Sequence, residues 1–416
     1  MLASERRALL KNSNKPVNIK YHNQKLILSL LRKADTLSIA ELSKKAKLSK
    51  TTIAKVIGEF MAKGLVLNAG KGESTDVGGK KPEMFSFNAS FSHVAALAVR
   101  KDEMLGAITD LRGKPLCHRE MPCGPRVAYE AALGQMAGMF HNLLADSGLS
   151  PNNLFGIVLG CEGVVDVERN LVRYTLQHDW GRNLDIAADL QAHIRLPIPI
   201  RMDNNVRLSG YAYLEAEQYG VMVVISSGRS TGGCVVEARE LIHGDNGFVG
   251  ELGHVIVEPS SKIRCRCGTR GCFEAMVSPD LILAEARKQA GRHPDSPFRR
   301  RTLEKKFAIG DVFSAADAGD AFARLLLDKV INYFVILIHN IVLLRDPGKI
   351  IIQGLYAEAG DYFFASIRER LRSLPFYKTP HAPPIIRAAM GPEDPLLLGA
   401  ARFGADEFLR GNHLYD

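Results

Sequence analysis

Three cysteines stand close together in the segment CRCGTRGC, which runs from Cys265 to Cys272. Their C-x-C-x4-C spacing, with Gly268 and Gly271 between them, allows a tight turn that brings three sulfurs onto one ion. A closed tetrahedral zinc site needs a fourth ligand, and His254 in the upstream segment GELGH is the nearest candidate. The alternative is that the three thiols are unrelated and free. The spacing favours a structural Zn²⁺ site with the ligands His254, Cys265, Cys267 and Cys272.

The chain has 416 residues, more than one hydrophobic core usually supports, so two or three domains are expected. Its seven cysteines are an odd number, and its first residues lack the long apolar stretch of a secretory signal. Both features favour free thiols or a metal site over disulfides, and we expect a cytoplasmic protein. The longest apolar stretch, residues 330–346, contains Asn and His and predicts a buried helix, not a membrane span.

Positive charge is concentrated at the start of the chain. Residues 1–82 hold 17 Lys and Arg against 6 Asp and Glu, a net charge of +11, whereas the other residues hold 37 against 39, which gives −2. The net charge of +9 therefore belongs to the N-terminal segment, which predicts an anionic partner for that segment alone.

The same segment has the pattern of a helix-turn-helix. Ser38 followed by Glu41 predicts a capping box, Ser49 can cap the next helix, and Gly64 can end it. In this arrangement the N-terminal residues of the second helix meet base edges in the major groove of DNA.

Two predicted strands around a polar, glycine-rich loop follow over residues 65–88 and are typical of the wing of a winged helix. A basic helical domain that docks on protein is the alternative, but the confined charge and the wing favour double-stranded DNA. The residues predicted to face DNA are Ser49, Lys50, Thr51, Thr52, Lys55, Lys71, Lys80 and Lys81.

From about His93 onward, short β-rich runs alternate with helical stretches, which predicts an α/β architecture of two lobes. The segment GELGHVIVEPSSKIRCRCGTRGCFEA resembles the signature of the ROK family, which groups sugar-responsive transcriptional repressors with sugar kinases. The segment LSIAELSKKAKLSKTTIAKVIGEFMAKGLV followed by VGGKKP resembles the DNA-binding domain of the repressor branch. DPGKIIIQG and LGAARFGADEFL resemble the family's C-terminal segments.

This resemblance implies an N-terminal winged helix domain followed by a two-lobed, actin-like and hexokinase-like α/β domain with a structural zinc ion. The implied divisions are a DNA-binding domain over residues 1–88, a first lobe over 89–200 and 390–416, and a second lobe over 201–389. By their match to the family's motifs, the residues that would hold sugar hydroxyls are Asp203, Glu251, His254 and Glu274. The three carboxylates suit this task because each accepts two hydroxyl hydrogen bonds. His254 would bind zinc through one ring nitrogen and offer the other to the sugar.

Three stretches that resemble nucleotide-binding turns of the family kinases are altered here. Residues 100–103 replace a first glycine-containing phosphate turn, Arg229 and Ser230 replace a Thr-Gly pair in the second, and Gln353 replaces the first of two glycines. Glycine permits the close backbone approach that phosphates need, so we predict that the ATP site and the kinase activity are lost. Asp203 matches the family's catalytic aspartate and keeps an active sugar kinase as one alternative.

The sequence therefore predicts a homodimeric or homotetrameric repressor of sugar-metabolism genes that reads a pseudo-palindromic operator. A sugar or sugar phosphate would close the two lobes and lower the affinity for DNA. Met202 and Gln177 stand where the family usually has asparagine. They favour a second alternative, in which a protein partner triggers the regulator.

Overall fold

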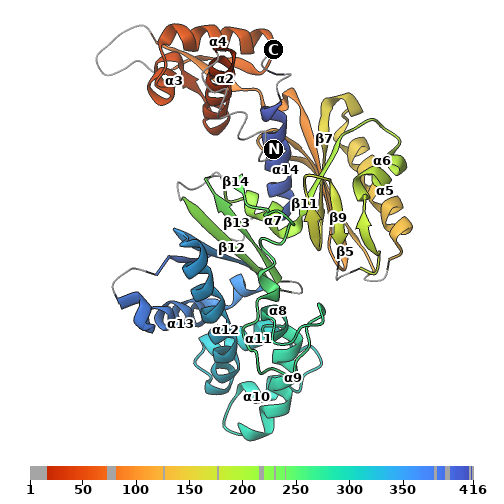
Figure 1. Cartoon of the computed structure of the whole chain (residues 1–416), viewed down its shortest axis with the longest axis vertical. Coiled ribbons are helices and arrows are strands. Elements are labelled where there is room, and N and C mark those ends of the chain that lie inside the picture. The colour runs from red at the N-terminus through yellow and green to blue at the C-terminus, as the bar shows by residue number, and fades with distance from the viewer. Residues whose placement is uncertain are drawn as a thin grey trace. The chain divides into compact units, whose positions relative to one another are not determined.

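The computed structural model describes residues 16–72, 81–124, 127–175, 178–214, 220–228, 231–238, 240–378, 382–388, 394–411 and 414 (Figure 1). The chain divides into two compact units. Unit 1 comprises Met1–Asn204 and Leu396–Asp416, and unit 2 comprises Asn205–Pro395. The strand that ends at Asn204 pairs within the sheet of unit 1, and unit 2 begins directly after it.

The first part of unit 1 is a winged helix. A three-stranded antiparallel sheet of order β1-β3-β2 packs beside its helices. Ser38 forms the predicted capping box with Glu41, the Ser49 side chain accepts a hydrogen bond from Thr52 N at 3.1 Å, and Gly64 adopts a φ of +76°. The three local predictions are thus confirmed. The elements are α2 (Pro16–Lys33), β1 (Leu37–Ser38), α3 (Ile39–Ala46), α4 (Lys50–Ala62), β2 (Val66–Lys71) and β3 (Glu83–Phe87).

The rest of unit 1 is built on a five-stranded sheet of order β11-β7-β4-β5-β6. Helices α5 (Tyr129–Ser147) and α6 (Ile186–Ile194) cover one face, and α14 (Pro395–Arg410) covers the other (Figure 1). Gly404 allows α14 to lie against this sheet, since a Cβ atom there would approach Val94 Cγ1 to 2.6 Å. The strands are β4 (His93–Val99), β5 (Glu103–Asp110), β6 (Pro115–Pro122), β7 (Leu154–Cys161) and β11 (Ile200–Asn204). A small antiparallel sheet adds β8 (Val164–Asp166), β9 (Leu171–Tyr174) and β10 (Arg182–Leu184).

Unit 2 contains a second five-stranded sheet, of order β14-β13-β12-β15-β16. Alternate residues such as Val223, Ile225, Ile350 and Ile352 join its main hydrophobic core. The other face carries the short helix α7 (Asn205–Tyr211), which lies close to β13 because Gly210 has no side chain. The strands are β12 (Val221–Ser227), β13 (Thr231–Glu237), β14 (Glu240–Leu241), β15 (Lys349–Gly354) and β16 (Ile385–Arg387).

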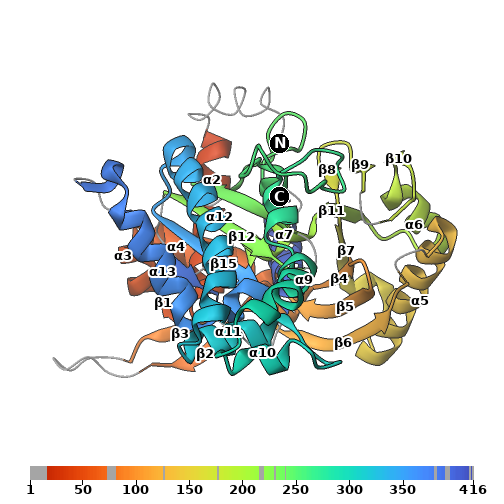
Figure 2. The same ribbon diagram turned by 90° about the horizontal axis from the view of Figure 1, so that it is seen from below.

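Helix α12 (Ala321–Arg345) lies at the centre of this core, beside α13 (Gly360–Ser373) (Figure 2). Within the described residues it is the one helix long and apolar enough to cross a membrane. In its apolar stretch of 18 residues, 56% is buried inside the protein. The predicted buried helix is therefore confirmed. The remaining helices of unit 2 are α8 (Phe273–Met276), α9 (Pro279–Gln289), α10 (Phe298–Arg301) and α11 (Ile309–Asp317).

Candidate functional site

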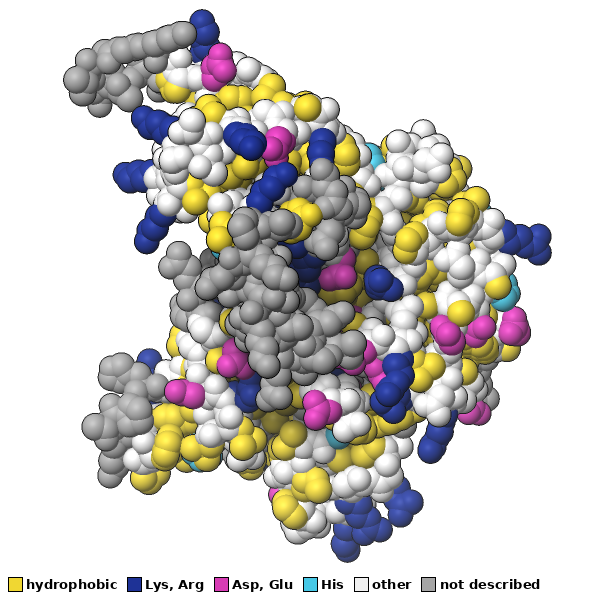
Figure 3. Space-filling view, turned by 45° about the horizontal axis from the view of Figure 1, so that its top comes forward, with side chains coloured by type: hydrophobic (Ala, Val, Ile, Leu, Met, Phe, Trp, Pro, Cys, Tyr) yellow, Lys and Arg dark blue, Asp and Glu magenta, His cyan; other side chains and the backbone are white. Residues whose placement is uncertain are grey.

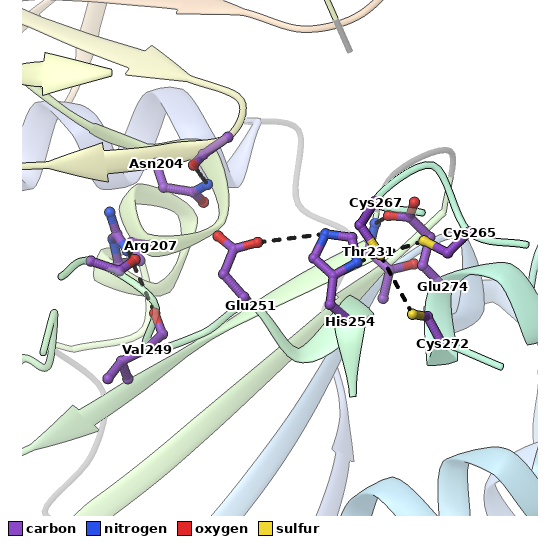
Figure 4. A network of polar contacts seen from close by, with 12 residues as sticks. Asn204, Arg207, Thr231, Val249, Glu251, His254, Cys265, Cys267, Cys272 and Glu274 are labelled. Carbon is purple, nitrogen blue, oxygen red and sulfur yellow. Dashed lines mark hydrogen bonds and ion pairs between the residues drawn. The ribbon is translucent and has the colours of Figure 1, made fainter. Parts of the chain in front are cut away.

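One histidine and three cysteines come together in unit 2, with one potential ligand atom from each lying within 4.8 Å of all the others (Figure 4). His254 ends a short 3-10 helix, and its Nδ1 lies 3.6 Å from Cys265 Sγ. Cys267 Sγ lies 3.7 Å from Cys272 Sγ. Gly271 is required in this loop, because it has a φ of +69° and a Cβ atom would lie 1.9 Å from the carbonyl oxygen of Glu258.

The donor set matches the chemistry of zinc. Three thiol sulfurs and an imidazole nitrogen are the ligands that Zn²⁺ takes in closed tetrahedral sites. Burial raises the pKa of the Cys265 thiol and raises that of Cys272 to about 12. Burial also raises the pKa of Cys267, but hydrogen bonds involving Thr269 and the neighbouring thiols lower it below the ordinary value overall. The four side chains are thus compatible with zinc, whose positive charge would favour the thiolate forms.

Two carboxylates lie beside this cluster. His254 Nε2, the ring nitrogen away from Cys265, lies 3.9 Å from Glu251 Oε2. Glu274, in α8, accepts a hydrogen bond from Thr231 N at 2.9 Å. Burial raises the pKa of the Glu251 carboxyl, His254 and Arg207 act to lower it, and Glu274 acts to raise it. Three of the four residues predicted to hold a sugar therefore gather in one part of unit 2.

Asp203, the fourth, belongs to unit 1, where it is completely buried near the end of β11. Its Oδ1 accepts a hydrogen bond from Asn204 N at 2.6 Å, and the Asn204 side chain donates to the carbonyl oxygen of Gly163 at 2.7 Å. Gly163 has a φ of +107°, and a Cβ atom there would lie 2.3 Å from the carbonyl oxygen of Tyr174. The turn at Gly163 thus helps to fix the end of the strand that carries Asp203. Gln177 lies outside the described residues.

The altered nucleotide turns have definite structures where the chain is described. Arg100 N donates to the carbonyl oxygen of Glu103 at 2.9 Å, and the Arg100 guanidinium pairs with the Glu103 carboxylate at 2.9 Å. Gln353 is buried and donates to Ser209 Oγ at 2.6 Å, while its oxygen accepts from Tyr213 at 3.0 Å. A hydrogen-bonded side chain therefore occupies the space beside β15 that a glycine would leave empty. Arg229 and Ser230 lie outside the described residues.

The residues predicted to face DNA lie at the start of α4 and along the wing. The buried face of α4 packs inward through Ile53, Val56, Ile57 and Phe60, which leaves the predicted face on the surface. Lys and Arg side chains gather over this domain in Figure 3. Exposed or half-buried positions are held by Ser49, Lys50, Thr51, Thr52, Lys55, Lys71 and Lys81, whereas Lys80 lies outside the described residues.

Two buried arginine side chains, one in each unit, were not predicted from the sequence. Arg32, in α2, forms an ion pair with Asp406 of α14, and only 8% of the Arg32 side chain is exposed. No sequence pattern connects residues so far apart in the chain. Arg207, in α7, is 1% exposed. From the sequence alone, an arginine on the surface fits this position equally well. The apolar residues on both sides of it, in NNVRLSGYAYL, were the available signal.

Comparison with known proteins places these features in a family. The family model named ROK family matches residues 95–406, and a winged helix-turn-helix DNA-binding model matches residues 22–66. The chain is 25% identical over 395 residues to the xylose repressor of Bacillus subtilis, covering 94% of this chain and 97% of that protein. It is 30% identical over 230 residues to a glucokinase of Halalkalibacterium halodurans, covering 54% of this chain and 68% of the kinase.

A solved structure shares the fold over the same extent. The ROK family transcriptional regulator described as a homolog of the Escherichia coli MLC protein superimposes with a TM-score of 0.76 at 22% identity, covering 94% of this chain and 98% of that one. The ROK model alone spans well over half of the present sequence. The protein is therefore a member of the ROK family that carries an N-terminal winged helix-turn-helix domain.

Proposed function

We propose that the protein is a transcriptional repressor of sugar-metabolism genes, and that a sugar or sugar phosphate bound in unit 2 controls its affinity for an operator. The chain is homologous over almost its whole length to xylose repressors, DNA-binding domain included. It acts in the cytoplasm as a homodimer or homotetramer, so that two winged helices meet a pseudo-palindromic site.

The orientation of His254 is the observation that carries the sugar-binding part of the proposal. One ring nitrogen points to the cysteine sulfurs and the other to Glu251 (Figure 4). The four ligands His254, Cys265, Cys267 and Cys272 would hold Zn²⁺, which when bound fixes the position of the loop and the tautomer of the imidazole. His254 then presents Nε2 beside the Glu251 carboxylate, where both can hydrogen-bond adjacent sugar hydroxyls.

Glu274 and Asp203 complete the proposed set of sugar contacts. Glu274 already accepts a hydrogen bond from Thr231 N, which fixes the direction of its carboxylate. Asp203, the fourth predicted residue, belongs to unit 1. The sugar would bind one conformation of the protein more tightly than the others. This difference in affinity is what lets a sugar act as a switch.

Helix α14 offers a route from this change to the DNA-binding domain. It begins at Pro395, where the chain passes from unit 2 to unit 1. At its other end, the Arg410 carbonyl oxygen accepts a hydrogen bond from Lys25 Nζ at 3.0 Å, and Asp406 pairs with Arg32. We infer that a sugar-induced change at the start of α14 alters the position of the winged helix.

We also propose that the protein does not phosphorylate its sugar. Two of the stretches that match nucleotide-binding turns of the family kinases are altered in this protein. One holds the ion-paired turn at Arg100 and Glu103, and the other holds the side chain of Gln353. The glucokinase relatives and the retained Asp203 make an active kinase the second candidate.

Calorimetric titration of the zinc-loaded protein with D-xylose, D-glucose and N-acetylglucosamine, and with their phosphates, tests sugar binding directly. The proposal predicts saturable binding of at least one of them without ATP. A coupled assay with ATP and the same sugars tests the second candidate: turnover above that of Asp203→Asn supports a kinase, and its absence supports a regulator.

A further inference from the structure

Arg207 lies in α7, four residues after Asp203, and has one of the largest fully buried side chains in the described structure. An arginine remains ionised at any physiological pH, so its burial is costly unless hydrogen bonds and a negative charge compensate it. The groups that hydrogen-bond the Arg207 guanidinium show which segment of the chain this side chain holds in place.

Two partners of Arg207 lie about 40 residues later in the chain (Figure 4). Its guanidinium Nη1 donates to the carbonyl oxygen of Gly247 at 3.0 Å and lies 3.5 Å from that of Val249. Both carbonyls belong to the loop of residues 244–250, which leads directly into Glu251. The buried charge therefore holds the backbone immediately before a proposed sugar-binding carboxylate.

This loop belongs to no strand or helix of the described structure. Its end is fixed by a backbone hydrogen bond of 2.6 Å from Gly233 N to the carbonyl oxygen of Gly250. Gly250 has a φ of +99°, and a Cβ atom there would lie 2.2 Å from the carbonyl oxygen of Gly233. The backbone before that anchor, at residues 247 and 249, is held by Arg207. A loop with three glycines at positive φ, Gly244, Gly247 and Gly250, needs such an anchor because glycine restricts the backbone so little.

Arg207 also acts on the Glu251 carboxylate through its charge. Burial raises the pKa of the Glu251 carboxyl, and the positive charge of Arg207 is among the influences that lower it. The role of Arg207 in orienting the loop rests on its hydrogen bonds to the carbonyl oxygens of Gly247 and Val249.

From this geometry we propose that Arg207 is a positioning residue for sugar recognition: it fixes the loop of residues 244–250 so that Glu251 faces the sugar beside His254. The inference rests on the proposed sugar-binding function and adds a residue to it. Arg207 makes no contact with the sugar in this scheme and acts only through the loop.

The test uses the full-length, zinc-loaded protein with Arg207→Met, Arg207→Lys and a control, Arg368→Met. Arg368 suits this purpose because it also donates to a backbone carbonyl of unit 2, that of Ile385 at 2.8 Å, but on another element. Affinity is measured by calorimetry with D-xylose, D-glucose and N-acetylglucosamine. Hydrogen exchange of peptides covering residues 244–251 is measured without sugar.

We expect Arg207→Met to weaken sugar binding by about tenfold or more, the usual effect of losing hydrogen bonds to a charged group. The loop should exchange faster in this variant, while the affinity for operator DNA without sugar stays unchanged. Arg207→Lys, which keeps the charge and can still reach a carbonyl oxygen, should recover most of the affinity. A residue with a general structural role would lower stability and operator binding as well, and Lys would not restore the sugar affinity selectively.

Unchanged sugar affinity and unchanged loop exchange in Arg207→Met, relative to Arg368→Met, would overturn the inference. If Arg207→Met does not fold, Arg207→Lys decides. Wild-type hydrogen exchange at residues 244–251 together with wild-type sugar affinity supports the anchor. Faster exchange of the loop together with weaker sugar binding shows that Lys does not replace Arg207 and overturns the inference. Failure of the wild-type protein to bind any sugar tells against the proposed function itself. Loop exchange would then still test whether Arg207 holds the loop.

Discussion

Arg32 in the DNA-binding domain and Asp406 in the last helix, α14, form an ion pair although they are 374 residues apart in the chain. The Arg32 side chain is almost completely buried, and Asp406 is about one-third exposed. Lys63 Nζ adds a hydrogen bond of 3.0 Å to the carbonyl oxygen of Leu414. The winged helix is thus attached to the C-terminal end of unit 1 by charged side chains.

Asp406→Asn should separate DNA binding from its control. The domain keeps its own core and the residues proposed to face DNA, so operator affinity without sugar should change little. Removing the carboxylate takes one charged partner from the buried Arg32, which weakens the attachment. We expect most of the sugar-induced change in operator affinity, about fivefold or more for a typical coupling, to disappear.

Fluorescence anisotropy with labelled operator DNA, with and without sugar, measures this effect. Asp146→Asn is a suitable control because Asp146 pairs with Arg119 at 2.5 Å on the exposed surface of the same unit. A full sugar response in Asp406→Asn would show that the ion pair plays no part in the coupling.

Replacing a zinc ligand should impair sugar binding more than DNA binding. In Cys272→Ser one of the four proposed ligands is lost, so zinc content should fall below one ion per chain, and sugar affinity should fall because the proposed zinc ion would no longer hold His254. Elemental analysis and calorimetry measure the two quantities. Cys117→Ser, at a half-buried cysteine outside the cluster, should retain both; full zinc content in Cys272→Ser would contradict the ligand assignment.

Lys55→Ala should weaken operator binding and reduce its dependence on salt. Lys55 is exposed on α4, one turn after the N-terminal residues of the proposed recognition helix. If it contacts a phosphate, the slope of log affinity against log salt concentration should decrease in magnitude by about 1. Lys329→Ala, at an exposed position of α12 in unit 2, serves as control. Equal slopes for Lys55→Ala and wild type would remove Lys55 from the interface.

His178 should make the stability of unit 1 depend on pH. It is 5% exposed and stacks on Trp180 at 4.3 Å between ring centroids. Burial lowers the pKa of His178, although the backbone of Arg100 and the charge of Asp102 oppose this. The unfolded chain therefore binds a proton more readily than the folded one. This contribution to stability is complete above about pH 6.5 and decreases as the pH falls below it.

Thermal denaturation of wild type and His178→Leu at two pH values, about 7.5 and 5.5, measures this contribution. We expect the melting temperature of wild type to fall by about 2 °C more than that of the variant over this interval. Loss of zinc at low pH affects both proteins and cancels in the comparison. Equal falls would show that His178 does not titrate differently on folding.

Local features of this protein were predictable because their causes lie within a few residues of one another. The caps at Ser38 and Ser49, the inward face of α4 and the cysteine spacing each depend on a short segment. Long-range polar contacts were not predictable, because a buried arginine gives no indication in sequence of which distant carbonyl or carboxylate compensates it. Arg207 with Gly247, and Arg32 with Asp406, are of this kind.

The most direct test of the central claim is a titration of operator DNA with wild type and Glu251→Ala, each with and without the sugar that wild type binds. The account predicts equal DNA affinity for both proteins without sugar, because Glu251 lies in unit 2 and the residues proposed to face DNA lie in the winged helix. It predicts that sugar lowers the affinity of wild type and leaves that of Glu251→Ala unchanged. A variant that responds to sugar as wild type does, or that no longer binds the operator at all, would contradict the account.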